Sequence, residues 1–217
     1  AISVGNATKL KFDDYFVQEG LAFRFTPFNY KKWGDAEGDN GYAIDTEKFY
    51  ENVMNRYKYG GLDTPGLYLD ETTMRICYSH RRLFAQLAKE LVKQGDNARA
   101  QKVLAYAEQA IPAYNVPQVY ESGSYDIATA YASIGETGKA ITLLNDLISE
   151  SRDYIDWAFS LGDSRIAMVQ RDCLYKFWQW NQCNGLLKDM DKERYKQSNQ
   201  QFEEKYMRLA QLMNYQN

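Results

Sequence analysis

The amino-acid sequence predicts a mainly α fold of stacked helical hairpins, preceded by a short extended N-terminal segment. Three observations lead to this prediction. Apolar residues recur at spacings of three and four from residue 45 onward, one arrangement of residues repeats along the chain, and only four prolines interrupt its 217 residues. The composition is that of an ordinary globular protein, because 45% of the residues are hydrophobic and 25% are charged.

The first 45 residues differ from the rest because their apolar residues alternate instead of following a helical period. Leu21, Phe23 and Phe25 alternate with smaller or polar residues, and Glu19-Gly20 just before them is a turn signal. We therefore expect a short β-hairpin here. The run over residues 34–41 is rich in Gly and Asp, which predicts a loop.

The remaining elements are predicted as helices from their apolar spacing and from their end signals. Asp45 or Thr46 begins the first helix, which is expected to end at Gly60-Gly61. A long amphipathic helix, capped by Asp70, then runs until Gly95. Further helices are expected at about 97–111, 119–134, 137–150, 164–183 and 191–214, with a short piece at about 153–161.

Two stretches of the chain share one arrangement of large and small residues. The first contains Phe84, Leu87, Ala88, Leu91, Gly95, Ala100, Leu104, Ala107 and Pro112. The second contains Ile127, Ala128, Tyr131, Gly135, Ala140, Leu144 and Leu147, in the same register forty positions later. The alanines let two antiparallel helices approach closely, and the glycine permits a tight connection between them. This arrangement fits the tetratricopeptide pattern, whose usual period is about 34 residues, so we expect a tetratricopeptide-like α-α superhelix.

The expected domain organisation follows from this repeat. Residues 1–45 form an extended N-terminal segment, and residues 46–217 form a helical-repeat domain. Within that domain the repeat-like units cover about 80–112, 120–152 and 163–214. The alternative is a set of packed helical hairpins that belong to no repeat family, since alanine-rich helices recur widely.

In such a repeat the first helix of each unit lines a concave face. The residues expected on that face are Arg82, Lys89 and Lys93 from the first unit, and Ser122, Tyr125 and Thr129 from the second. A surface that places basic side chains beside hydroxyl and aromatic side chains suits a carboxylate, a phosphate or a sugar as ligand. The alternative is that these are ordinary solvated helix faces.

Catalytic and metal sites find little support in the sequence. His80 is the only histidine, it precedes two arginines, and no Gly-x-Ser-x-Gly motif occurs, so we interpret it as structural. Asp35, Glu37 and Asp39 resemble the start of a calcium loop, but Asn40 stands where the turn glycine belongs. We expect no catalytic residue, metal or cofactor.

Charge and cysteine spacing exclude further classes. A net charge of −3 removes the electrostatic basis for binding a nucleic-acid backbone. No window approaches the roughly 18 apolar residues of a membrane-spanning helix. Cys173 and Cys183 lie ten positions apart in an expected helix, roughly 15 Å along its axis, and are too far apart to form a disulfide.

Aromatic residues are abundant, with 18 Tyr, 10 Phe and 4 Trp. Most are expected in the core, because each buries a large area. Trp178 and Trp180 are two positions apart on an expected helix and cannot both face inward. One of them is therefore a candidate for a contact surface.

Several separated strings of the sequence resemble one family. They are Gly20-Leu21-Ala22-Phe23-Arg24-Phe25-Thr26-Pro27, Asp45-Thr46-Glu47-Lys48, Tyr50-Glu51-Asn52-Val53-Met54, Tyr68-Leu69-Asp70-Glu71, His80-Arg81-Arg82-Leu83-Phe84, Ile111-Pro112 and Val116-Pro117. They are similar to the C-terminal soluble region of large bacterial membrane proteins of unknown function, grouped with protein O-mannosyltransferase-like enzymes. The resemblance covers nearly the whole chain. It implies a membrane-embedded glycosyltransferase-type region that precedes this tail, and it assigns no catalytic residue to the present positions.

Together these features predict a non-catalytic module that binds a protein, a peptide or a glycan on the periplasmic side of the inner membrane. Its other expected partner is its own N-terminal membrane region. Two alternatives stay open. One is a glycan-processing enzyme domain that uses aromatic platforms and a carboxylate pair, and the other is a structural tail for self-association.

Overall fold

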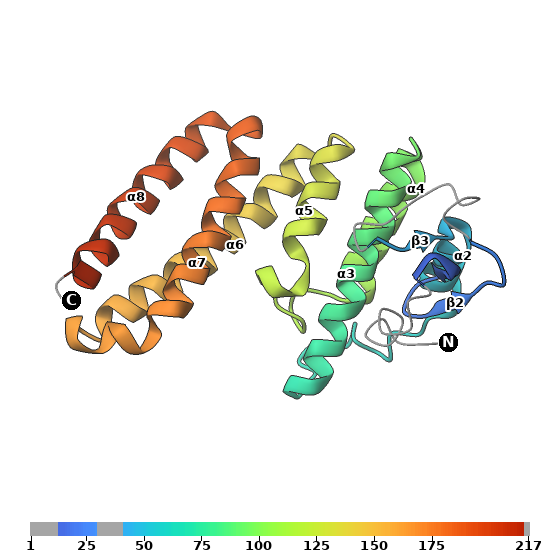
Figure 1. The fold of residues 1–217 in the computed structure, drawn as a ribbon, viewed down its shortest axis with the longest axis horizontal. Coiled ribbons are helices and arrows are strands. Elements are labelled where there is room, and N and C mark those ends of the chain that lie inside the picture. Colours follow the sequence, from blue (N-terminus) through green and yellow to red (C-terminus); the bar gives the residue numbers. More distant parts are fainter. Residues whose placement is uncertain (1–12, 30–40, 215–217) are drawn as a thin grey trace. The chain divides into compact units, whose positions relative to one another are not determined.

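The structure is a computed structural model that describes residues 13–29 and 41–214, and it is mainly helical (Figure 1). The chain divides into two compact units, Ala1–Pro117 (unit 1) and Gln118–Asn217 (unit 2). This division differs from the boundary expected between residues 45 and 46. The N-terminal strands belong with the first helices, because Gln18 on the sheet exchanges side-chain hydrogen bonds of 2.9 Å with Gln86.

Unit 1 contains a three-stranded sheet in the order β2-β1-β3. Strands β1 (Phe16–Gln18) and β2 (Phe23–Phe25) pair antiparallel, and the Glu19 amide donates to the Ala22 carbonyl across the turn at 3.0 Å. The predicted β-hairpin is confirmed. Strand β3 (Ala43–Ile44) pairs parallel to β1 and was not predicted, because two residues are too few to show an alternating pattern. Residues 34–40 of the predicted loop, and with them the calcium-like residues, lie outside the described ranges.

The helices of unit 1 begin where the sequence predicts. Helix α2 (Thr46–Glu51) is capped by the Asp45 carboxylate and continues into a π-helical turn, η4 (Asn52–Arg56). The helix therefore ends before Gly60, because Tyr57 is already extended, with ψ 145°. Helix α3 (Glu71–Lys93) is capped by Asp70, whose carboxylate accepts the first amides at 2.8 and 3.0 Å. The backbone hydrogen bonds and the Thr73 hydroxyl hold the pKa of Asp70 below its usual range.

Helices α3 and α4 (Asn97–Ala110) pack against each other as the predicted hairpin. The connection turns at Gly95, whose φ of +79° is a left-handed value that glycine adopts at little cost. Ala88 and Ala100 are fully buried between the helices. The small side chains therefore permit the close approach that the sequence indicated.

A buried arginine ties α3 to the segment that follows α4. Arg81 is only 3% exposed, and its guanidinium donates to the carbonyls of Ile111, Val116 and Pro117 at 3.2, 2.7 and 2.8 Å. Burial lowers the pKa of Arg81 to about 10, so the side chain is still charged at neutral pH. These hydrogen bonds satisfy backbone carbonyls that no regular element would satisfy.

The regular elements of unit 2 are all helical over its described residues. After a 3-10 turn, η5 (Tyr120–Ser122), four helices follow: α5 (Ser124–Ser133), α6 (Thr137–Ser160), α7 (Asp163–Met190) and α8 (Lys192–Asn214). Each packs against the next in the chain. Three predicted boundaries were wrong. Helix α5 starts later, because Gly123 is left-handed at φ +82°; the expected pieces at 137–150 and 153–161 are one helix; and α7 extends beyond residue 183.

The core of unit 2 is formed by α6, α7 and α8, with Ala128 of α5. Trp180 is fully buried, and its indole N–H donates to the Ser198 hydroxyl at 2.7 Å. The hydroxyl of Ser198 donates in turn to Asn184 at 2.6 Å. The indole N–H of Trp180 and the Ser198 hydroxyl are thus satisfied within the core. The Nδ2 atom of Asn184 is buried without a hydrogen-bond partner among the described residues.

All three cysteines are free and buried. Cys77 lies on α3, whereas Cys173 and Cys183 lie on α7, so the prediction that the latter two do not pair is confirmed. Burial raises the pKa of each thiol, that of Cys183 to about 12.

Over the described residues, no helix combines the length and the apolar character that crossing a membrane requires.

Candidate functional site

The three basic residues predicted for the concave face lie along α3 in unit 1. Arg82 is exposed and donates to the Ser79 hydroxyl at 3.2 Å. Lys93 pairs with Glu90 at 2.8 Å, and Lys89 is half-buried. Because Lys93 pairs with a glutamate of its own helix, these three residues offer a ligand less positive charge than the sequence indicates.

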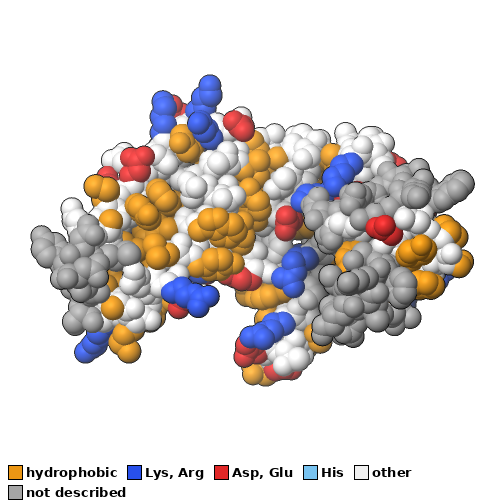
Figure 2. All heavy atoms as spheres, in the orientation of Figure 1, with side chains coloured by type: hydrophobic (Ala, Val, Ile, Leu, Met, Phe, Trp, Pro, Cys, Tyr) orange, Lys and Arg blue, Asp and Glu red, His pale blue; other side chains and the backbone are white. Residues whose placement is uncertain are grey.

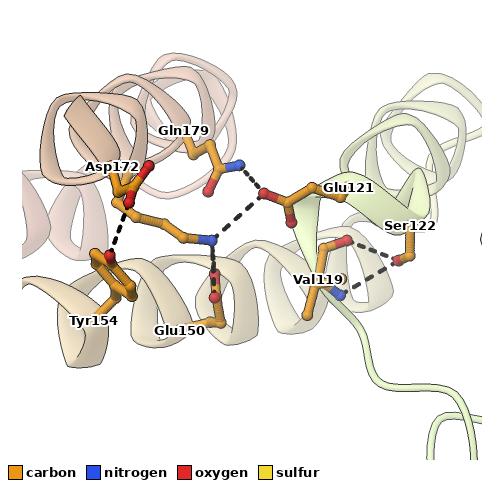
Figure 3. Close-up of polar contacts among 8 residues, drawn as sticks. Val119, Glu121, Ser122, Glu150, Tyr154, Asp172 and Gln179 are labelled. Carbon is orange, nitrogen blue, oxygen red and sulfur yellow. Dashed lines mark hydrogen bonds and ion pairs between the residues drawn. The ribbon is translucent and has the colours of Figure 1, made fainter. Parts of the chain in front are cut away.

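The three residues predicted from unit 2 lie in different settings. Ser122 is fully buried in η5, where its hydroxyl donates to the Val119 carbonyl at 2.7 Å (Figure 3). The expectation that it faces a ligand is therefore wrong, because a side chain that closes a turn inside the protein is not accessible. Thr129 is half-buried and donates to the Tyr125 carbonyl of its own helix at 2.9 Å. The proposed concave face combines residues of both units and stays a prediction.

Tyr125, by contrast, belongs to a row of rings on unit 2 that we call the aromatic face: Tyr120, Tyr125, Tyr175 and Trp178. Tyr125 stacks on Tyr120 with ring centroids 5.3 Å apart, and Tyr120 meets the edge of Trp178 at 5.3 Å. Trp178 stacks on Tyr175 at 5.6 Å. Trp178 and Tyr175 are each 47% exposed, which is a large exposure for side chains of this size.

The exposure of Trp178 follows from helix geometry. Positions two apart on a helix point about 200° apart around its axis, so α7 buries Trp180 and leaves Trp178 outside. The prediction that one of these two tryptophans reaches the surface is confirmed. Figure 2 shows other hydrophobic side chains reaching the surface over α6 and α7, with charged side chains between them.

A polar network borders the aromatic face, and Figure 3 shows its side chains turned toward one another from η5, α6 and α7. The Lys176 ammonium donates to both oxygens of Glu150 at 2.9 and 3.0 Å and lies 3.6 Å from Glu121. The Gln179 amide donates to the same Glu121 carboxylate at 2.7 Å. The Lys176 side chain is only 12% exposed, so solvent screens these interactions less than it screens a surface pair.

A hydrogen bond between a tyrosine and a carboxylate lies beside this network. The Tyr154 hydroxyl donates to the Asp172 carboxylate at 3.4 Å, and its ring lies 5.2 Å from that of Trp157, which is 48% exposed. Burial, followed by the charge of Asp172, raises the pKa of Tyr154. Burial also raises the pKa of Tyr120. Both phenols are therefore neutral hydrogen-bond donors at physiological pH.

The charges of this region are unequal. Glu121, Glu150 and Asp172 are three carboxylates, against the ammonium of Lys176 and the exposed guanidinium of Arg171, which precedes Tyr175 by four positions on α7. Glu121 and Asp172 are exposed. Glu121 and Glu150 do converge, but they converge on an ammonium that hydrogen-bonds to Glu150 and forms a 3.6 Å ion pair with Glu121. Their arrangement is that of an ion-pair network and not of a proton donor beside a proton acceptor.

His80 does not belong to this region, since it lies on α3 in unit 1. It is half-buried, and its ring meets the edges of Tyr57 and Tyr59 at centroid distances of 5.9 and 5.5 Å. Burial lowers its pKa, so the imidazole is neutral at physiological pH. Within the described part of the chain, no three His, Cys, Asp or Glu side chains gather as a metal site would require.

The network residues Glu121, Glu150, Lys176 and Gln179 were missed in the sequence. They come from three elements, and only their packing brings them together. A partial signal existed on α7, where Asp172, Lys176 and Gln179 follow a spacing of three and four and therefore share one stripe.

Comparison with known proteins gives no match to any protein-family model, curated protein or solved structure. The family resemblance drawn from the sequence strings therefore stays a prediction.

Proposed function

We propose that the chain is a non-catalytic protein-binding module whose contact surface is the aromatic face of unit 2. The observation that carries this proposal is the pair of stacked, half-exposed rings of Tyr175 and Trp178 beside an excess of carboxylates. Tyrosine and tryptophan dominate the energetic centres of protein interfaces, because they bury a large area at low entropic cost.

The bonding state of the polar groups favours a protein over a sugar at this face. A sugar presents many hydroxyls, each of which needs a hydrogen-bond partner. Lys176, Glu150 and Gln179 already bond within the protein. The aromatic face therefore offers ring surface and negative charge more than it offers free hydrogen-bonding groups.

The chemistry of the partner follows from that charge. A segment that carries apolar side chains next to lysines or arginines would bury the former against Tyr175 and Trp178. Its cations would approach the exposed carboxylates of Glu121 and Asp172. A cation over a tyrosine or tryptophan ring adds about 0.5–2 kcal/mol. We therefore propose a basic, apolar segment of a protein as the occupant.

The test uses two labelled 18-residue helical peptides, one of Leu and Lys and one of Leu and Glu, in fluorescence anisotropy titrations of the full chain. The Leu/Lys peptide should bind, and added salt should weaken it. Trp178→Ala or Tyr175→Ala should weaken binding about tenfold or more, as loss of a central aromatic does in interfaces. Tyr68→Ala is the matched control, because Tyr68 is an 88% exposed tyrosine of unit 1.

Three results would contradict the proposal: equal binding of both peptides, no effect of the two aromatic substitutions, or an equal loss with Tyr68→Ala. Sedimentation of the free chain addresses the competing self-association function. A dimer that Trp178→Ala dissociates would show that a second copy occupies the aromatic face.

The proposed module is a tetratricopeptide-like repeat, and two features support it. Gly95 and Gly135 follow the first helix of successive hairpins with φ of +79° and +84°, and Ala88 and Ala128 are both fully buried. The resemblance of the sequence strings adds a location to the proposal, the periplasmic tail of an inner-membrane glycosyltransferase-like protein.

A further inference from the structure

An open cleft in unit 1, of about 380 Å³, is independent of the aromatic face. It lies beside the connector that joins η4 to α3, and helix α4 forms its other side. Three tyrosines, Tyr57, Tyr59 and Tyr106, contribute to its lining. The volume is within the range of pockets that hold small molecules.

Four polar side chains contribute to the lining of this cleft. Asn55, Lys58, Asp63 and Gln109 line it. Within the described part of the chain, none of these four side chains makes a hydrogen bond or an ion pair. An isolated surface residue in that state is ordinary, because water satisfies it. Four such groups around one cleft with aromatic walls form a set of donors and acceptors that a single ligand can satisfy together.

The walls of the cleft are fixed before any ligand arrives. The Tyr59 hydroxyl donates to the Val53 carbonyl at 3.1 Å, and its ring packs on Phe84 with centroids 5.5 Å apart. The Tyr57 hydroxyl accepts the Leu21 amide at 3.0 Å. A pocket whose rings are held in this way loses little entropy on binding.

The connector itself is also held. The Asn115 amide donates to the carbonyls of Leu62 and Thr64 at 2.7 and 2.6 Å, and the Tyr114 hydroxyl donates to that of Asp63 at 2.7 Å. Arg81 fixes the segment that carries Asn115 through the carbonyls on either side of it. The cleft is therefore a preformed feature of unit 1.

From these observations we propose that the unit 1 cleft binds a small neutral saccharide of one or two rings. Lys58 and Asp63 contribute one charge of each sign, so the cleft attracts neither anions nor cations as a class. The amides of Asn55 and Gln109 each donate and accept, which matches sugar hydroxyls, since these also do both. The tyrosine rings provide apolar surface for the C–H faces of a sugar.

The test is saturation-transfer difference NMR on the full chain with about 10 mM of each probe. The probes are glucose, N-acetylglucosamine, maltose and cellobiose, with glycine and methyl phosphate as charged comparisons whose C–H protons the method detects. At least one saccharide should receive saturation, and isothermal titration of that saccharide should give a dissociation constant. Glycine and methyl phosphate should receive none.

Gln109→Ala and Asn55→Ala should each weaken the saccharide about three- to tenfold, the loss of one or two hydrogen bonds. Gln101→Ala is the matched control, because Gln101 is an exposed glutamine of the same helix that does not line the cleft. Thermal unfolding followed by circular dichroism checks that all three variants stay folded, which their exposure favours.

Saturation of glycine or methyl phosphate in place of a saccharide would overturn the proposal, and so would the absence of any saccharide signal. An equal loss with Gln101→Ala would also overturn it. None of these outcomes affects the peptide titration on unit 2, so the two proposals fail separately.

Discussion

Aromatic side chains gather at one surface in each unit, but the polar groups beside them differ in their bonding. At the aromatic face of unit 2, Lys176, Glu150 and Gln179 are bonded to one another or to Glu121. At the cleft of unit 1, Asn55 and Gln109 have no partner among the described residues. Aromatic content alone therefore does not identify a ligand. The hydrogen bonds that a surface still has to offer decide which ligand it suits.

We expect the largest effect from removing the arginine that holds the backbone beside the cleft. Arg81→Ala leaves three backbone carbonyls without their donor and removes a packed side chain, so we expect the free energy of unfolding to fall by about 3 kcal/mol. Saccharide binding should weaken as well, because the segment around Asn115 loses its anchor. Urea denaturation measures the first effect and isothermal titration the second.

Arg82→Ala is the control for that substitution. Its side chain is exposed, and its loss should change the free energy of unfolding by no more than about 0.5 kcal/mol. Equal stability of the two variants would show that the buried arginine does not hold the cleft.

A substitution at the aromatic face should have a smaller effect on stability. Lys176→Met removes the ammonium that bridges Glu121 and Glu150, and we expect a loss of about 1 kcal/mol, reduced by the partial exposure of both carboxylates. The Leu/Lys peptide should nevertheless bind more tightly, because the face becomes more negative. The peptide affinity measured by anisotropy should therefore rise, while the free energy of unfolding measured by urea denaturation falls.

Lys196→Met provides the matched control on unit 2. Lys196 also pairs with a glutamate, Glu193 at 3.2 Å, but it is 70% exposed. Its substitution should leave both measurements nearly unchanged. A similar response to both substitutions would mean that burial does not distinguish the network from an ordinary surface pair.

The smallest expected effect depends on pH and separates the units. Burial lowers the pKa of His80 below its ordinary value of about 6.5, so the unfolded chain binds more protons than the folded chain in the window just below that pH. The contribution of His80 to the free energy of unfolding should therefore be fully present above pH 6.5 and should be lost as the pH falls through the pKa of the folded state. His80 is the only histidine, and a one-residue NMR titration measures its pKa directly.

His80→Gln should remove that part of the pH dependence. Unit 2 contains no histidine, so its amide signals should not change in this window. A His80 pKa at or above 6.5 would contradict the expected desolvation.

Local signals predicted most of the elements. Asp70 marked the start of α3, Gly95 its end, and Glu19-Gly20 the turn of the hairpin. The expected break in α6 near residue 152 was wrong. No Gly or Pro occurs between residues 139 and 161, so nothing in the backbone interrupts the helix there. Buried Ser151 and Ile155 continue the apolar stripe through that polar stretch. A polar run interrupts a helix only when it also interrupts the buried face.

The candidate sites were predicted less completely, for reasons of distance along the chain. Trp178 was found because its spacing from Trp180 is local. The cleft depends on the path of a connector with two successive left-handed glycines, Gly60 and Gly61, and on its bonds to Asn115. The network at the aromatic face depends on three packed elements. Neither arrangement leaves a pattern in a short stretch of sequence.

Each unit contains at least one buried thiol, whose reaction with an alkylating reagent reports the local unfolding of that unit. Cys77 lies in unit 1, whereas Cys173 and Cys183 lie in unit 2. Iodoacetamide reacts with the thiolate, which burial disfavours at all three positions, most of all at Cys183 with its pKa of about 12. Alkylation should therefore wait for local unfolding. Mass spectrometry of the alkylated cysteines would time the opening of the two units separately, without any substitution in the chain.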